Sequence, residues 1–223
     1  MRQVHAGVAR HGFTVLAHEQ TAGKGQRSKQ WFAEPNTNLM LSVVIEPGAL
    51  FATPLFTFSM AMAVAAHGLL KKYANDVTIK WPNDLYIGDR KAGGILIENS
   101  LGGGQWKVAV VGMGLNINQT DFGDLNEKAI SLKRATGKTY DIIALAKELC
   151  QEIDGFLKKL ETDPDFIVNS YHQHLYKKDK WVKLKQGSRT FEAQILGVNA
   201  AGQLVTRHVI EETFDVGAVE WVL

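Results

Sequence analysis

Residues 20–31, which read QTAGKGQRSKQW, are the stretch around which the rest of the chain is arranged. Gly23 and Gly25 stand two apart, so the backbone there can adopt positive φ and approach a ligand closely. Three cations lie within six residues: Lys24, Arg27 and Lys29. Apolar runs at 13–17 and 39–45 flank this polar stretch, which predicts a basic loop between two core strands. Such a loop suits an anion such as phosphate, although on its own the segment favours a solvated surface loop.

The overall composition of the 223 residues limits the class of protein. A hydrophobic fraction of 45% and a charged fraction of 22% are ordinary for a soluble globular protein. The net charge of +2 argues against a nucleic-acid partner, because dedicated nucleic-acid binders carry a strongly basic face. No apolar run reaches the length of a membrane span, and no secretory signal is visible. Since the one cysteine, Cys150, cannot form an internal disulfide, we expect a cytoplasmic protein with no membrane partner.

Apolar periodicity predicts a first domain, residues 1–178, that is built from both strands and helices. We expect helices at 53–72, 141–160 and 163–175, and the end of another in residues 1–12 that closes at Gly12. We expect strands at 13–18, 39–45, 77–81, 84–87, 92–98 and 106–111.

The character of the chain changes near Lys180. Short strands of alternating polarity are expected at 181–184, 190–198, 202–208 and 219–223, with a hairpin turn at 199–202. Residues 179–223 are therefore predicted to form a small β-barrel. It is too small for a generous core of its own, so we expect it to lean on the larger domain.

Two further stretches carry residues suited to chemistry. In residues 80–98, Lys80 ends a strand, Lys91 begins the returning strand, and the glycines at 93–94 leave room for a ligand. Taken singly, each of these residues favours a solvated hairpin with a surface lysine. In residues 112–118 a Gly-x-Gly turn is followed by two asparagines, which could donate to a nucleotide or simply hold the turn.

Taken together, the three stretches resemble the biotin protein ligases. Residues 20–31 resemble that family's Gly-Arg-Gly-Arg loop, and residues 80–84 (KWPND) are close to its most recognisable sequence motif. Residues 90–96 resemble its Arg-Lys-x-x-Gly-Ile-Leu strand, and residues 112–116 its Gly-x-Gly-x-Asn turn. The resemblance covers roughly residues 13–118. It implies the class II synthetase-like biotin/lipoate ligase fold: α+β, a central mixed sheet flanked by helices, and an SH3-like C-terminal barrel.

The resemblance implies a two-step reaction with ATP, biotin and phosphate-bound Mg²⁺. Biotin and ATP would give biotinyl-5′-AMP and pyrophosphate, and one lysine of a biotin carboxyl carrier protein would then take the biotinyl group. Two anions must meet in such a site, so cations have to converge on it. The mixed anhydride needs shielding from water, so we expect the loop at 23–30 to close over it.

The resemblance also implies roles for individual residues. Lys91 and Arg27 would be catalytic, and Asp84 would orient a cation or accept the proton of the attacking lysine. The expected biotin-binding residues are Gln20, Gly23, Lys24, Gly25, Gln26, Lys91 and Gly94. The expected ATP-binding residues are Arg27, Trp31, Lys80, Asn83 and Asn116. The sequence does not determine the Mg²⁺ ligands, the acceptor protein or the oligomeric state, for which a homodimer is one option.

Two departures from the family pattern keep alternatives open. Gln26 stands where the family usually has arginine. The Ser-Thr-Asn motif with which the family usually begins this domain does not precede Phe13. A DNA-binding domain ahead of the ligase domain is also absent, which predicts a short form without a repressor role. The alternatives are a lipoate or octanoate ligase, because lipoate ligases share the fold and the lysine, and a non-catalytic biotin-binding domain.

Overall fold

A computed structural model describes residues 1–26, 30–103 and 105–222 of the chain. Among these residues, six strands form one sheet in the order β1-β2-β6-β5-β4-β3, and every neighbouring pair is antiparallel. The strands are β1 (Thr14–Ala17), β2 (Leu39–Ile45), β3 (Val77–Lys80), β4 (Asp84–Ile87), β5 (Arg90–Gly102) and β6 (Gln105–Leu115). The prediction of a mixed sheet is wrong, because β3 to β6 follow one another through short connections that reverse the chain each time.

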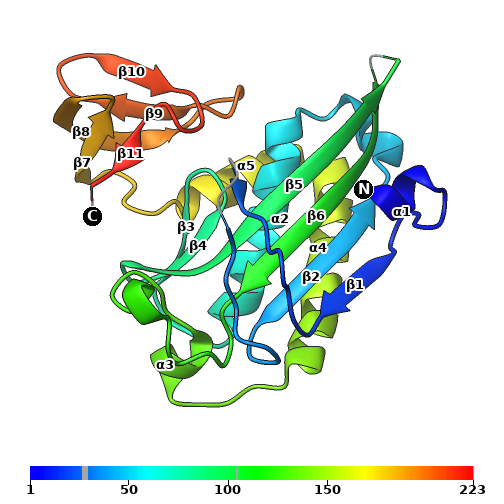
Figure 1. Ribbon diagram of the computed structural model, residues 1–223. Helices are drawn as coiled ribbons and strands as arrows, with labels where there is room; N and C mark the ends of the chain where they lie inside the picture. Colours follow the sequence, from blue (N-terminus) through cyan, green and yellow to red (C-terminus); the bar gives the residue numbers. More distant parts are fainter. Residues whose placement is uncertain (27–29, 104, 223) are drawn as a thin grey trace.

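Helices cover one face of this sheet (Figure 1). The long ones are α2 (Leu55–Lys71), α4 (Ile142–Thr162) and α5 (Pro164–Gln173). Alanines at 61, 63, 65 and 66 are fully buried, and their small size lets α2 approach its neighbours closely. Two of the predicted helix starts are confirmed. The Asp141 carboxylate accepts from the backbone N–H groups of Ile143 and Ala144, and the Asp163 carboxylate accepts from that of Phe166.

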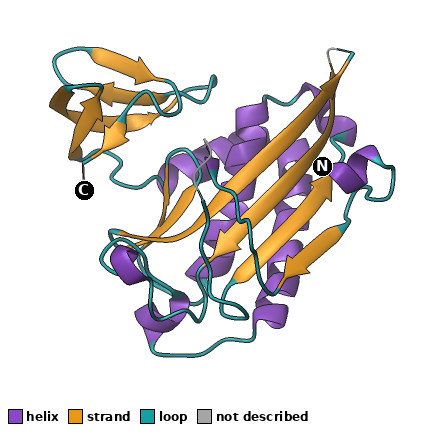
Figure 2. Ribbon diagram, viewed as in Figure 1, coloured by secondary structure: helices purple, strands orange, loops and turns teal. Residues whose placement is uncertain are grey.

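The opposite face of the sheet is crossed by the segment between β1 and β2, in blue in Figure 1. Among its described residues this segment contains no α-helix and no strand of the sheet, and Figure 2 draws it mainly as loop. The prediction of a basic loop between two strands is therefore confirmed for residues 20–26 and 30–31. No helix among the described residues combines the length and the hydropathy needed to cross a membrane.

Short elements account for most differences from the predicted boundaries. The helix expected in residues 1–12 ends at His5 (α1, Arg2–His5), because the chain turns at Gly7 with φ +69° and then runs beside β2. There the backbone N–H of Gly12 donates to the Val44 carbonyl at 2.8 Å. The remaining short helices are η2 (Gly48–Ala52), η3 (Gly123–Leu125) and α3 (Leu132–Thr136).

A second antiparallel sheet forms the C-terminal β domain, with five strands among the described residues in the order β10-β9-β8-β7-β11. They are β7 (Trp181–Gln186), β8 (Arg189–Val198), β9 (Leu204–Arg207), β10 (Glu211–Phe214) and β11 (Glu220–Trp221). The boundary expected at residues 178/179 falls in the connection between α5 and β7. The sequence analysis missed β10, whose charged residues Glu211 and Glu212 give no apolar alternation.

The C-terminal domain packs against the first domain, as expected for so small a unit. The Trp81 indole donates to the backbone carbonyl of Gly202 at 2.9 Å, and Gly202 lies directly against the ring of Phe56. The His172 ring nitrogen Nε2 lies 3.0 Å from the backbone nitrogen of Val198. Buried residues of both domains belong to one continuous hydrophobic cluster, so the two sheets share a core.

Candidate active site

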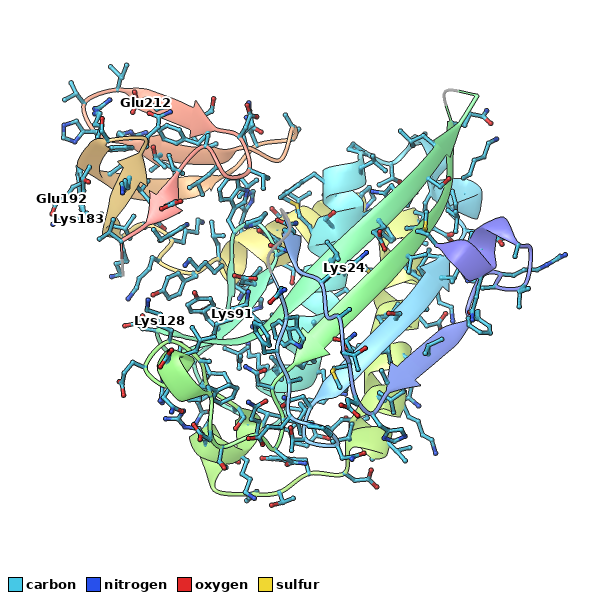
Figure 3. The ribbon with its side chains drawn as sticks, viewed as in Figure 1. Lys24, Lys91, Lys128, Lys183, Glu192 and Glu212 are labelled. Carbon is cyan, nitrogen blue, oxygen red and sulfur yellow. The ribbon has the colours of Figure 1, made fainter. Side chains whose placement is uncertain are left out.

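A cavity of about 810 Å³ opens on the face of the sheet that the loop crosses. Its walls are the loop, the β3–β4 turn and the C-terminal segment 216–221, and its floor is the middle of β2, β5 and β6. Ten of the predicted site residues line it: Gln20, Lys24, Gly25, Gln26, Trp31, Lys80, Asn83, Asp84, Lys91 and Gly94. Figure 3 shows Lys24 and Lys91 on this same face. The convergence of cations from separate segments is therefore observed.

A β-bulge turns Lys91 toward this cavity. Tyr86 of β4 pairs with Lys91, but Leu85 pairs with Gly93, so Ala92 is the extra residue on β5. Without the bulge, alternation along the strand would put Lys91 and Gly94 on opposite faces of the sheet. With it, both line the cavity. Bulges commonly re-aim side chains beside active sites, and this one brings the lysine onto the ligand side.

Asp84 is the ion-pair partner of Lys91. The Lys91 ammonium lies 2.6 Å from the Asp84 carboxylate and 5.9 Å from the centre of the Trp31 ring. Gly94 pairs with Asp84 across the strands, and a Cβ there would lie 3.2 Å from the carboxylate and 3.4 Å from the ammonium. The glycine thus leaves room for the pair. The ammonium is held in place, and the Lys91 side chain remains about one third exposed, so an anion can reach it.

The backbone of Lys91 is fixed from behind by the segment 116–130. The N–H of Lys91 donates to the Lys128 carbonyl at 2.8 Å, and its carbonyl accepts from Ile130 at 2.9 Å. The side-chain amide of Asn116 also donates to the Lys91 carbonyl, at 3.3 Å. Asn116 is only 4% exposed and lies outside the lining of the cavity. Its amide braces the strand that carries Lys91, and its place beside a nucleotide stays a prediction.

Two glycines let the Trp31 ring lie flat on the floor of the cavity. A Cβ on Gly114 of β6 would lie 2.7 Å from Trp31 Cε2, closer than side chains tolerate. A Cβ on Gly23 would collide with the Trp31 carbonyl, and the Gly23 carbonyl accepts from the Trp31 N–H at 3.0 Å. Gly23 therefore shapes the loop. It does not appear among the described residues that line the cavity. Arg27, predicted to be catalytic, lies outside the described residues.

Lys80 lines the cavity at the end of β3, where it pairs with Asp84 across the strands. Its ammonium donates to the Tyr86 hydroxyl at 3.1 Å. Burial, with a smaller contribution from Asp84, raises the pKa of Tyr86, so the phenol stays neutral. The neighbouring Asn83 side chain donates to the Ile95 carbonyl, which ties the β3–β4 turn to β5. Lys80 and Asn83 thus keep fixed positions at the wall.

One wall of the cavity could not be inferred from the motifs. Val216, Gly217, Val219, Glu220 and Trp221 come from the C-terminal domain. They lie more than 130 residues from Lys80 along the chain and match no motif. No group of three or more His, Cys, Asp or Glu side chains in the described part of the chain could hold a metal ion.

The comparisons with known proteins agree with this architecture. The chain superimposes on the biotin protein ligase from Aquifex aeolicus, whose structure is a complex with biotin and ATP, with a TM-score of 0.80. The match covers 96% of this chain and 90% of the other at 21% identity, and at that identity it establishes the fold alone. The fold is that of the biotin ligases: an antiparallel sheet with helices, followed by a β domain.

Sequence similarity then assigns the family. Residues 5–116 match the Biotin/lipoate A/B protein ligase family, and the chain belongs to it, as the motifs predicted. It is 31% identical over 208 residues to the bifunctional ligase/repressor BirA of Salmonella typhimurium, covering 89% of this chain and 63% of that protein. It is 37% identical over 134 residues to the biotin–[acetyl-CoA-carboxylase] ligase of Paracoccus denitrificans, covering 57% and 55%. The chain thus spans less than two thirds of these curated relatives.

Proposed function

We propose that this protein is a biotin–[acetyl-CoA-carboxylase] ligase. In the first step the biotin carboxylate attacks the α-phosphorus of ATP, and pyrophosphate leaves. In the second step the amine of a lysine on a biotin carboxyl carrier protein attacks the acyl carbon of biotinyl-5′-AMP. AMP leaves, and the amine loses a proton as the amide forms. Family membership and the names of the relatives support this proposal.

The observation that carries the proposal is the set of three lysines around one cavity. Lys24 comes from the loop, Lys80 from the end of β3, and Lys91 from the start of β5. A carboxylate and a triphosphate repel each other, and cations held in fixed positions offset that repulsion. We assign to Lys91 the stabilisation of the negative charge that develops on the α-phosphate and on the acyl oxygen. Asn83 and Trp31 border the nucleotide.

The proposal is tested by measuring which carboxylic acid supports the release of pyrophosphate from ATP. Biotin should support release, whereas lipoate and octanoate should not; the reverse preference would make the protein a lipoate or octanoate ligase. Substituting Lys91→Ala should slow biotin-dependent release by at least ~100-fold, because removing one preorganised donor to a developing charge costs about that much.

Lys183→Ala is the matched control for the loss of a lysine. Lys183 lies on β7 of the C-terminal domain, away from Lys91 in Figure 3, so this variant should react at the wild-type rate. If the wild-type protein binds biotin but releases no pyrophosphate with any acid, it is a non-catalytic biotin-binding domain and the proposal is wrong.

A further inference from the structure

The Lys80 ammonium is held among aromatic rings that come from both domains. Its Nζ lies 4.9 Å from the centre of the Tyr86 ring on β4 and 5.3 Å from that of the Trp221 ring on β11. A cation over the face of an aromatic ring is attracted by the ring's quadrupole, most strongly by tryptophan. Lys80 and Trp221 both line the cavity, so this contact joins the two domains at the candidate active site.

Tyr176 completes the cluster and fixes it to the first domain. Its ring centre lies 5.0 Å from that of Tyr86 and 5.7 Å from that of Trp221. Its hydroxyl donates to the Asp89 carboxylate at 2.8 Å, and the Lys177 ammonium binds the same carboxylate at 2.8 Å. Burial, followed by the bond to Asp89, raises the pKa of Tyr176, so the hydroxyl keeps its proton and remains a donor.

Trp221 is held from the C-terminal side by its strand. It pairs with Leu184 of β7, and Leu184 is fully buried in the shared core. The position of the indole therefore follows the position of the C-terminal sheet. A lysine side chain has four rotatable carbon–carbon bonds and loses much conformational freedom when it is fixed. A ring that confines its ammonium before the ligand arrives removes part of that cost from the binding step.

We propose that Trp221 is a positioning residue for the triphosphate of ATP, acting through Lys80. The C-terminal sheet uses this ring to hold the Lys80 ammonium at the cavity wall, in the place where it meets phosphate. The proposal rests on the proposed function, because it takes ATP to be the ligand that Lys80 serves. It makes the C-terminal domain part of the nucleotide site through one identified contact.

The test compares Trp221→Leu, which removes the aromatic face but keeps apolar volume, with Trp221→Phe, which keeps a face. In biotin-dependent pyrophosphate release, Trp221→Leu should raise the KM for ATP roughly tenfold, with the KM for biotin changed less than about twofold. Trp221→Phe should recover most of the loss. The control is Trp181→Leu, since Trp181 is an exposed tryptophan of the same domain that lies outside the cavity lining; it should leave both KM values unchanged.

Two further measurements separate positioning from folding. In a Lys80→Ala background, Trp221→Leu should have no additional effect on the KM for ATP, because the ring acts only through the ammonium. Additive losses, or equal changes in both KM values, would mean that Trp221 merely supports the fold, and the proposal would be overturned.

A spectroscopic signature reports the contact without any enzymatic turnover. In the NMR spectrum the ε-methylene protons of Lys80, assigned from their loss in Lys80→Ala, should be shifted upfield by the rings. They should move toward the usual lysine position in Trp221→Leu. Absence of this shift in the wild-type protein overturns the proposal even if ATP is used. If the shift is present but no acid supports pyrophosphate release, the contact stands, whereas the proposed function and the role toward ATP both fail.

Discussion

The Lys91 ammonium and the Asp84 carboxylate, 2.6 Å apart, form an ion pair in the lining of the cavity. The two side chains are 35% and 27% exposed, so solvent screens their attraction and the pair adds less than about 1 kcal/mol to the free energy of unfolding. Its value lies in orientation, because the carboxylate fixes the direction in which the ammonium points. When an anionic substrate arrives, the ammonium can turn toward it without crossing the cavity.

Exchanging Asp84→Asn should therefore slow formation of the acyl-adenylate by about tenfold while leaving the unfolding midpoint nearly unchanged. Biotin-dependent pyrophosphate release measures the first step, and transfer from preformed biotinyl-5′-AMP to the carrier protein measures the second. Asp154→Asn is the control, since Asp154 forms an exposed ion pair with Lys158 on α4. If only the transfer step slows, Asp84 serves the attacking lysine as a proton acceptor and does not orient Lys91.

Between elements, two stacked histidines join α2 to the segment that follows α5. The rings of His67 and His174 lie 4.0 Å apart at an angle of 21°, and His67 Nε2 lies 3.1 Å from the Val77 carbonyl. Burial, followed by the nearby His174, lowers the pKa of His67 to about 4; Lys71 adds to the effect, and the bond to Val77 opposes it. Burial and Lys71 lower the pKa of His174 as well. Both rings are therefore neutral in the folded protein at pH 7.

This pair predicts a loss of stability in acid. Because the pKa of His67 is lower in the folded state than in the unfolded state, the unfolded chain binds more protons below about pH 6.5. The stabilisation is complete above that pH and is lost as the pH falls toward 4, and for His67 it amounts to about 3 kcal/mol. Urea unfolding at pH 7.5, 6 and 5 measures it.

The variant His67→Gln, which keeps an N–H donor for the Val77 carbonyl, should flatten the dependence of unfolding free energy on pH. His208→Gln, at an exposed position in the C-terminal domain, should leave it as steep as in the wild-type protein. An equally steep dependence in His67→Gln would show that other groups, rather than this stack, bind the protons.

The elements that the sequence predicted well are those whose signals are local. The helices α2, α4 and α5 and the strand β2 follow from apolar periodicity and from capping residues within a few positions of each end. The bulge at Ala92 and the strand β10 could not be found in this way, because each is defined by its partner strand. The direction in which Lys91 points therefore had to come from the structure, although its identity came from the motif.

For the molecule as a whole, the sequence predicted one side of the site and missed the other. The loop, the β3–β4 turn and the β5 glycines belong to recognisable sequence motifs, and residues of all three line one cavity. Asn116 belongs to such a motif, and its amide donates to the Lys91 carbonyl, a contact that the motif alone does not reveal. The wall at 216–221 contains no recognisable motif. It reaches the cavity only because the two domains pack together.

That packing depends on close contact at Gly202, and the last prediction concerns its loss. Gly187 and Gly202 both have positive φ, +59° and +84°, so alanine at either costs about 1 kcal/mol of backbone strain. Only at Gly202 would the added Cβ meet another side chain, the ring of Phe56 in the first domain. Gly187→Ala should lower the calorimetric midpoint by roughly 3 °C, and Gly202→Ala, with overpacking added, by roughly 5–12 °C. Since the domains share one core, both variants should unfold in a single transition. Equal shifts, or a separate early transition, would mean that the C-terminal sheet folds independently and that its wall of the cavity is not fixed by this contact.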